Sequence, residues 1–108
     1  MDANGIEGHG IALDGFNTNC EVYGNKIYSN EGEGIQVNFG ESASVYYNVV
    51  YSNGAHGIGL LQPANLSTVY NNTIAKNATA GIFNRAGRLN TTIRDNILYD
   101  NGTWGINV

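Results

Sequence analysis

Apolar and polar residues alternate in short stretches along this chain. In Gly-Ile-Gln-Val at 34–37 and in Gly-Ile-Gly-Leu at 57–60, the residues at alternate positions, Ile and then Val or Leu, are large and apolar. This period of two is that of a β-strand with one buried face, whereas an amphipathic helix repeats every ~3.6 residues. Asn and Gly, which tolerate left-handed backbone at tight bends, separate the stretches. The pattern therefore predicts short strands joined by tight turns.

The stretches recur at a nearly constant interval. Gly-Ile pairs begin at residues 10, 34, 57, 81 and 105, in steps of 24, 23, 24 and 24 residues. Upstream of the last four pairs, the pattern apolar-x-x-Asn-x-apolar-x-x-Asn returns in register, beginning at Val22, Val45, Val69 and Ile93. A repeat of this length with several short strands predicts a solenoid, in which equivalent strands of successive coils pair in parallel about 4.8 Å apart.

Each coil is expected to hold one strand at Gly-Ile-x-Val, one around the apolar residue before the first Asn, and one around the apolar residue after it. Equivalent residues would then stack in columns through the solenoid. The residues that we expect to face the core are Ile11, Leu13, Val22, Ile27, Ile35, Val37, Val45, Val50, Ile58, Leu60, Val69, Ile74, Ile82, Ile93, Leu98 and Ile106.

Two further columns consist of Asn. Their members are Asn25, Asn48, Asn72 and Asn96 in the first column and Asn30, Asn53, Asn77 and Asn101 in the second. Stacked Asn side chains can hydrogen-bond to one another and to the backbone. We interpret both columns as structural, the first at the tightest bend of the coil and the second at the next bend.

The repeat Val-x-x-Asn-x-Ile-x-x-Asn-x-x-x-Gly-Ile-x-Val resembles that of right-handed parallel β-helix proteins, which include pectate-lyase-like proteins, carbohydrate epimerases and phage tailspikes. The resemblance covers nearly the whole chain. It implies an all-β fold, a right-handed single-stranded parallel β-helix of about four and a half coils. The chain would form a single domain over residues 1–108, as a fragment or an uncapped repeat array. The resemblance specifies a fold and no single activity, because unrelated functions share this coil.

One stretch, residues 90–102, looks like coils of alginate epimerases. The Asp-Pro-His-Asp catalytic motif of those enzymes is absent, since the only proline, Pro63, follows Gln62. The aspartate cluster with which pectate lyases bind calcium has no clear counterpart either. The resemblance therefore gives no support for epimerase activity.

Composition narrows the function classes. The chain has 17 Asn and 15 Gly, a net charge of -4 and five Lys or Arg, so nucleic acid is not an expected partner. No apolar run approaches the length of a membrane span, no signal peptide is visible, and one cysteine excludes an internal disulfide. No cofactor is expected. The cellular location stays open, with an extracellular or cell-surface parent protein as one possibility.

Polar residues around the Gly-Ile strand could form a small site in the first three coils. Its members would be Glu7, His9, Asp14, Glu31, Glu33 and His56. Stacked carboxylates repel one another, which raises a pKa and can create a general acid, and two His with a Glu between them could instead hold a divalent metal. The competing interpretation is that these are solvated turn residues beside glycines. No metal is assigned on this evidence.

Tyrosines form two outward columns. Tyr23, Tyr46 and Tyr70 align in the first, followed by Arg94, and the second column reads Tyr28, Tyr51, Ala75 and Tyr99. Outward Tyr rings can stack on sugars, because they offer an apolar face with a polar tip. Alternatively, they form an ordinary ladder, since like aromatics pack well across neighbouring strands.

Two functions are compatible with these features. The first is a structural or carbohydrate-binding module without its own chemistry, which contacts a polysaccharide through the tyrosine columns. The alternative is a polysaccharide-active lyase or hydrolase that uses Glu7, His9, Glu31, Glu33 and His56.

Charge is unevenly distributed along the chain. Residues 1–54 carry seven acids and one Lys, whereas residues 55–108 carry two acids and four cations. Oppositely charged halves favour homo-oligomers that stack head to tail through their coil ends.

Overall fold

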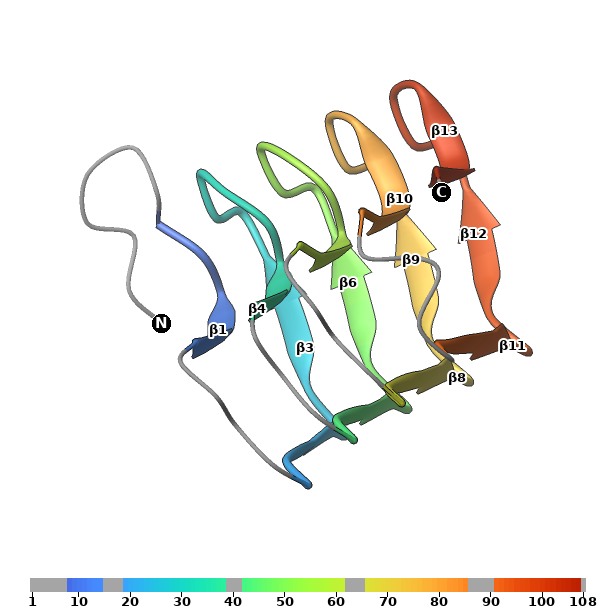
Figure 1. The fold of residues 1–108 in the computed structure, drawn as a ribbon. Coiled ribbons are helices and arrows are strands. Elements are labelled where there is room, and N and C mark those ends of the chain that lie inside the picture. The colour runs from blue at the N-terminus through green and yellow to red at the C-terminus, as the bar shows by residue number, and fades with distance from the viewer. Residues whose placement is uncertain (1–7, 15–18, 39–41, 62–65, 86–90, 108) are drawn as a thin grey trace.

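The protein is a parallel β-solenoid (Figure 1). The computed structural model describes residues 8–14, 19–38, 42–61, 66–85 and 91–107. Within these ranges every regular element is a strand, and no helix there could cross a membrane. Equivalent strands stack side by side along one axis, from the blue N-terminal end to the red C-terminal end in Figure 1. The predicted all-β solenoid is confirmed.

Three sheets form the walls of the solenoid. The first sheet contains β1 (Ile11–Asp14), β4 (Ile35–Asn38), β7 (Ile58–Leu60), β10 (Ala80–Asn84) and β13 (Trp104–Asn107). The second contains β2 (Glu21–Tyr23), β5 (Ser44–Tyr46), β8 (Thr68–Tyr70) and β11 (Thr92–Arg94). The third contains β3 (Lys26–Tyr28), β6 (Val49–Tyr51), β9 (Thr73–Ala75) and β12 (Ile97–Tyr99). Each repeat thus supplies one strand to each sheet, as the sequence predicts.

The strands pair in the register that the repeat dictates. Ile35 of β4 pairs with Ile58 of β7, and Val45 of β5 pairs with Val69 of β8. All the pairs between described strands are parallel. Residues 23 or 24 positions apart therefore lie one above the other, and a column of the sequence is a column of the molecule.

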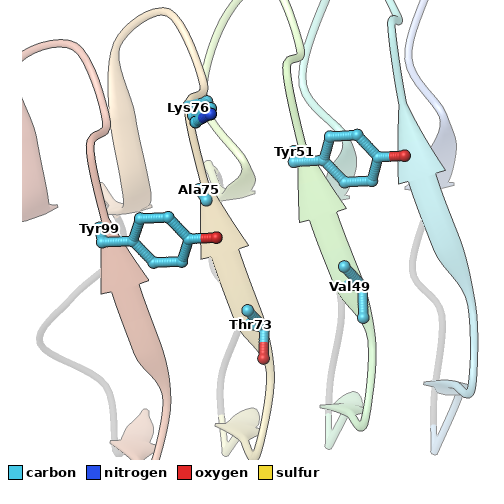
Figure 2. A pocket seen from close by; sticks show the side chains of 6 residues that line it. All are labelled: Val49, Tyr51, Thr73, Ala75, Lys76 and Tyr99. Carbon is cyan, nitrogen blue, oxygen red and sulfur yellow. The ribbon is translucent and has the colours of Figure 1, made fainter.

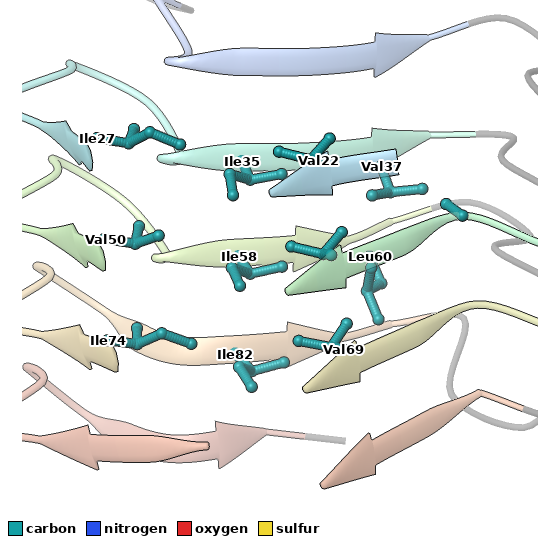
Figure 3. Close-up of a cluster of buried hydrophobic side chains, with 12 residues drawn as sticks. Val22, Ile27, Ile35, Val37, Val50, Ile58, Leu60, Val69, Ile74 and Ile82 are labelled. Atoms are coloured by element: carbon teal, nitrogen blue, oxygen red, sulfur yellow. The ribbon is translucent and has the colours of Figure 1, made fainter. Parts of the chain in front are cut away.

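The core is a stack of aliphatic layers inside the three sheets (Figure 3). Ile58 and Leu60 from the first sheet, Val69 from the second and Ile74 from the third are all completely buried. The prediction is wrong for one expected core residue, because Ile106 of β13 is 44% exposed. Among the described strands, β13 pairs only with β10, so no layer covers its other side. Ile11, Leu13, Ile93 and Leu98 are partly buried for the same reason, because they lie in the outermost layers.

Both Asn columns are continuous hydrogen-bonded ladders. The backbone N–H and the Nδ2 of Asn48 both donate to Oδ1 of Asn72, each at 3.0 Å. Nδ2 of Asn48 also donates to the carbonyl of Val22 in the preceding coil, at 2.9 Å. In the second column Asn53 donates to Asn77 in the same way. The ladders tie each bend to the bends above and below it.

The left-handed residues at these bends are not the ladder asparagines. They directly precede them: Gly24, Tyr47, Asn71 and Asp95 at the first bend, and Ser29, Ser52, Lys76 and Asp100 at the second. Positive φ is uncommon for residues such as Tyr and Lys. The ladder hydrogen bonds hold the backbone there, so the bend does not require Gly or Asn at the left-handed position itself.

Candidate functional site

A buried carboxylate lies beside the first sheet. Glu33, just before β4, has a side chain that is 11% exposed, and its Oε1 lies 3.0 Å from Nδ1 of His9. Gln36 of β4 donates from Nε2 to the same oxygen at 3.1 Å, and this Nε2 lies 3.2 Å from Nε2 of His9. Gly59 of β7 leaves room for the carboxylate, because a Cβ at that position would lie 3.1 Å from Cγ of Glu33. These contacts keep the Glu33 side chain against the sheet.

His9 makes two contacts that compete for one ring nitrogen. Nδ1 accepts the backbone N–H of Glu33 at 3.1 Å and also faces the Glu33 carboxylate. A ring nitrogen accepts when it is unprotonated and donates when it carries a proton. Protonation of Nδ1 would therefore exchange the amide contact for a charged hydrogen bond to the carboxylate.

His56 lies in the same column, one coil beyond Glu33 and two beyond His9. Its Nδ1 accepts the N–H of Ala80 at 3.2 Å and lies 2.7 Å from Oγ1 of Thr79, and its ring stacks on Phe83 with centroids 4.5 Å apart. Burial lowers the pKa of His56, although the negative charge of Glu33 acts in the opposite direction. The neutral ring, with its proton on Nε2, is therefore favoured.

The structure brings together three of the proposed catalytic residues: His9, Glu33 and His56. Glu31 is exposed, Glu7 lies outside the described residues, and only the backbone of Asp14 is described. Within the described residues the cluster thus holds one carboxylate, whereas glycosidases of either stereochemistry use two. No group of three or more His, Cys, Asp or Glu in the described part of the chain is placed to hold a metal ion.

Three further residues of this cluster were not included among the site residues proposed from the sequence. They are Gln36, Thr79 and Phe83. Gln36 and Phe83 occupy the outward position that follows the Ile of each Gly-Ile pair, and this alternation is the signal that could have identified them. Thr79 carries no such signal, since it lies in the turn before β10.

The tyrosines of the second sheet form a parallel stack. The ring of Tyr46 lies between those of Tyr23 and Tyr70, at centroid distances of 5.1 and 4.9 Å, and the guanidinium of Arg94 lies 4.5 Å from the Tyr70 centroid. The Tyr46 hydroxyl donates to Glu21 at 2.6 Å, and this hydrogen bond is the main cause that raises the pKa of Tyr46 to about 12. Because neighbours flank each inner ring, this column presents mainly ring edges and hydroxyls.

The tyrosine column of the third sheet is interrupted. Tyr28 and Tyr51 are parallel with centroids 5.1 Å apart, but Ala75 follows them and Tyr99 comes next. Tyr28 and Tyr99 are 51% and 54% exposed. Both columns therefore lie on the outside of the solenoid, as predicted. In the column of the third sheet, Ala75 leaves a side of the Tyr51 ring that no neighbouring tyrosine covers.

Comparison with known protein families identifies the fold. Residues 2–108 match the family model described as a right-handed beta helix region, and the chain belongs to this family. The family includes both enzymes and structural proteins, so membership establishes the fold and leaves the activity open. Comparisons with curated proteins and with solved structures found no match.

Proposed function

We propose that this right-handed β-helix is a glycan-binding module without chemistry of its own. The observation that carries the proposal is the pair of outward tyrosine columns on adjacent sheets, in which three successive coils supply a ring to one column and two successive coils supply a ring to the other. Tyr combines an apolar ring with a polar hydroxyl, which suits the apolar C–H faces and hydroxyl rim of a sugar. The sugar-contacting residues would be Tyr23, Tyr46 and Tyr70 in one column and Tyr28 and Tyr51 in the other.

The spacing of the columns supports a polymeric ligand. Coils of a parallel solenoid repeat at about 4.8 Å, so a tyrosine column offers contacts at that interval along the axis. A glycan that runs along the solenoid axis would therefore meet tyrosine contacts from several coils in turn. Several weak contacts in a row would add up to useful affinity.

Retention on polysaccharide affinity gels tests this function. The parent protein should be retarded on at least one gel of a panel of acidic and neutral polysaccharides, and the triple substitution of Tyr23, Tyr46 and Tyr70 by Ala should reduce that retention. Trp104→Ala is the matched control, because Trp104 is an aromatic residue of the first sheet that is 58% exposed. A parent protein that passes every gel unretarded would refute the proposal.

A second candidate function is a polysaccharide lyase or hydrolase that uses the cluster on the first sheet. The observation in its favour is the buried Glu33 carboxylate, 3.0 Å from His9 and close enough to His56 to affect its pKa. Such a carboxyl could exchange a proton with a substrate through the imidazoles. Product formation from acidic and neutral polysaccharides tests it. Glu33→Gln should abolish any activity, and Asp100→Asn, at an exposed position outside the cluster, should leave it intact. Equal activities of the two variants would exclude Glu33 as the catalytic group.

A further inference from the structure

One position of the tyrosine column on the third sheet lacks a ring. Strand pairing places Tyr28 beside Tyr51, Tyr51 beside Ala75, and Ala75 beside Tyr99. The Tyr28 and Tyr51 rings are 5.1 Å apart. A ring above Ala75 would therefore lie about 5 Å from Tyr51 on one side and from Tyr99 on the other.

A groove lies at this position on the outer face of the third sheet. Its volume is about 260 Å³, and its lining residues are Val49, Tyr51, Thr73, Ala75, Lys76 and Tyr99. Figure 2 shows the Tyr99 ring projecting from β12 toward Ala75, whereas the Tyr51 ring projects from β6 in the same direction, away from Ala75 and toward β3. We call this groove the Ala75 slot.

The chemistry of the slot matches that of a sugar ring. Val49, which is 43% exposed, forms an apolar wall, and Ala75, which is only 4% exposed, lies at the base of the groove. The hydroxyls of Thr73 and Tyr99 and the ammonium of Lys76 provide polar groups around it (Figure 2). Within the described residues Lys76 has no ion pair. A pyranose carries C–H bonds on both faces and hydroxyls at its rim, so it can contact aromatic rings and polar tips together.

The geometry points to a specific subsite, and we propose that the Ala75 slot binds one pyranose ring of a glycan in place of the missing tyrosine ring. Lys76 donates a hydrogen bond to an oxygen at the rim of that sugar. The slot is smaller than the about 300–1,000 Å³ of drug-sized ligand pockets, so it holds a single sugar residue and the rest of the glycan lies along the outer face. This inference rests on the proposed glycan-binding function and assigns it a position.

A substitution that completes the tyrosine column tests the slot. Ala75→Tyr should fill the groove with a ring, and Ala12→Tyr is the matched control because Ala12 is an exposed strand residue on the first sheet. Binding is measured by calorimetry with two probes, cellohexaose and an oligogalacturonate. Ala75→Tyr should weaken binding at least about tenfold, which corresponds to about 1.4 kcal/mol, and Ala12→Tyr should leave it unchanged.

Folding of the variants is checked by urea unfolding. Ala75→Tyr should be at least as stable as the parent, because the added ring joins an existing stack. Lys76→Gln should keep the groove open and weaken binding by about fivefold, as expected for the loss of one exposed charged hydrogen bond.

The outcomes separate the slot from the function. Absence of binding by the parent protein to either probe would overturn both the slot and glycan binding with these sugars. Equal affinities of the parent and a folded Ala75→Tyr variant would overturn the slot and leave glycan binding by the tyrosine columns intact. An unchanged affinity of Lys76→Gln would overturn the role of Lys76 at the rim.

Discussion

The Asn72 side chain makes four hydrogen bonds in the first Asn ladder, as that of Asn48 does, and its loss should be costly. Its Oδ1 accepts the backbone N–H and the Nδ2 of Asn48, both at 3.0 Å. Its Nδ2 donates to the Val45 carbonyl and to Oδ1 of Asn96, again at 3.0 Å each. Asn72 is 1% exposed, as is Asn48, so water cannot replace these partners. Asn72→Ala would remove all four hydrogen bonds from the interior.

The expected loss follows from which groups remain unpaired. The backbone N–H of Asn48 would lose its acceptor in a buried position, and a buried unsatisfied donor costs about 1–3 kcal/mol. The other three hydrogen bonds contribute about 0.5–1.5 kcal/mol each, as typical net values. We therefore expect Asn72→Ala to lower the free energy of unfolding by about 2.5–7.5 kcal/mol, which is a large part of the ~5–15 kcal/mol of an ordinary domain.

Asn25 provides the control within the same column. Its Nδ2 donates to the Tyr23 carbonyl and to Oδ1 of Asn48, but no described residue donates to its own Oδ1. Asn25→Ala therefore leaves no buried backbone donor unpaired and should cost only about 1–3 kcal/mol. Urea unfolding followed by circular dichroism measures both variants. Losses that agree within about 0.5 kcal/mol would show that the orphaned N–H is not the dominant cost.

Three further predictions concern packing and protonation. Gly57→Ala should destabilise the fold by about 1–3 kcal/mol by overpacking, because a Cβ there would lie 2.7 Å from a carbonyl oxygen of the next coil. Gly105→Ala should be nearly neutral in the same urea assay, because a Cβ at that position has nothing within 4 Å. Burial lowers the pKa of His56 below 6.5, so near and below pH 6.5 the unfolded chain binds more protons than the folded chain, and the free energy of unfolding should fall as the pH drops. In pH-dependent unfolding, the free energy of unfolding of His56→Gln should fall less than that of the parent, and an equal fall would contradict this. The Tyr46 phenol should stay protonated between its ordinary pKa of 10.0 and about 12, and Glu21→Gln should bring its ultraviolet titration back toward the ordinary value.

The fold was predictable because a parallel solenoid turns sequence period into spatial register. The steps between Gly-Ile pairs place Ile35 on Ile58, and the structure pairs these two residues. The period does not show how deeply each position is buried. Ile106 has the same local pattern as Ile82, yet it is 44% exposed while Ile82 is fully buried, because burial depends on a neighbouring coil on both sides.

For the candidate site, the sequence predicts which residues share a column but not the contacts that their side chains make. The alignment of His9, Glu33 and His56 follows from the period, and so do the tyrosine columns. The contacts of Gln36 and Thr79 do not, because they depend on which way a side chain leans across neighbouring coils. For the same reason the sequence shows that the tyrosine columns face outward but not how their rings cover one another.

Departures from a column are the informative positions in such a molecule. Stacking of like residues explains a repeated Tyr or Asn without any function, because each copy stabilises its neighbours. It does not explain Ala75 between Tyr51 and Tyr99, where a Tyr would gain ring contacts of about 0.5–1.5 kcal/mol with each neighbour. Proteins commonly forgo stability of this size where a binding site needs open space. Stability therefore does not explain why Ala75 stands where the column would hold a tyrosine, and this is the position at which we place the sugar.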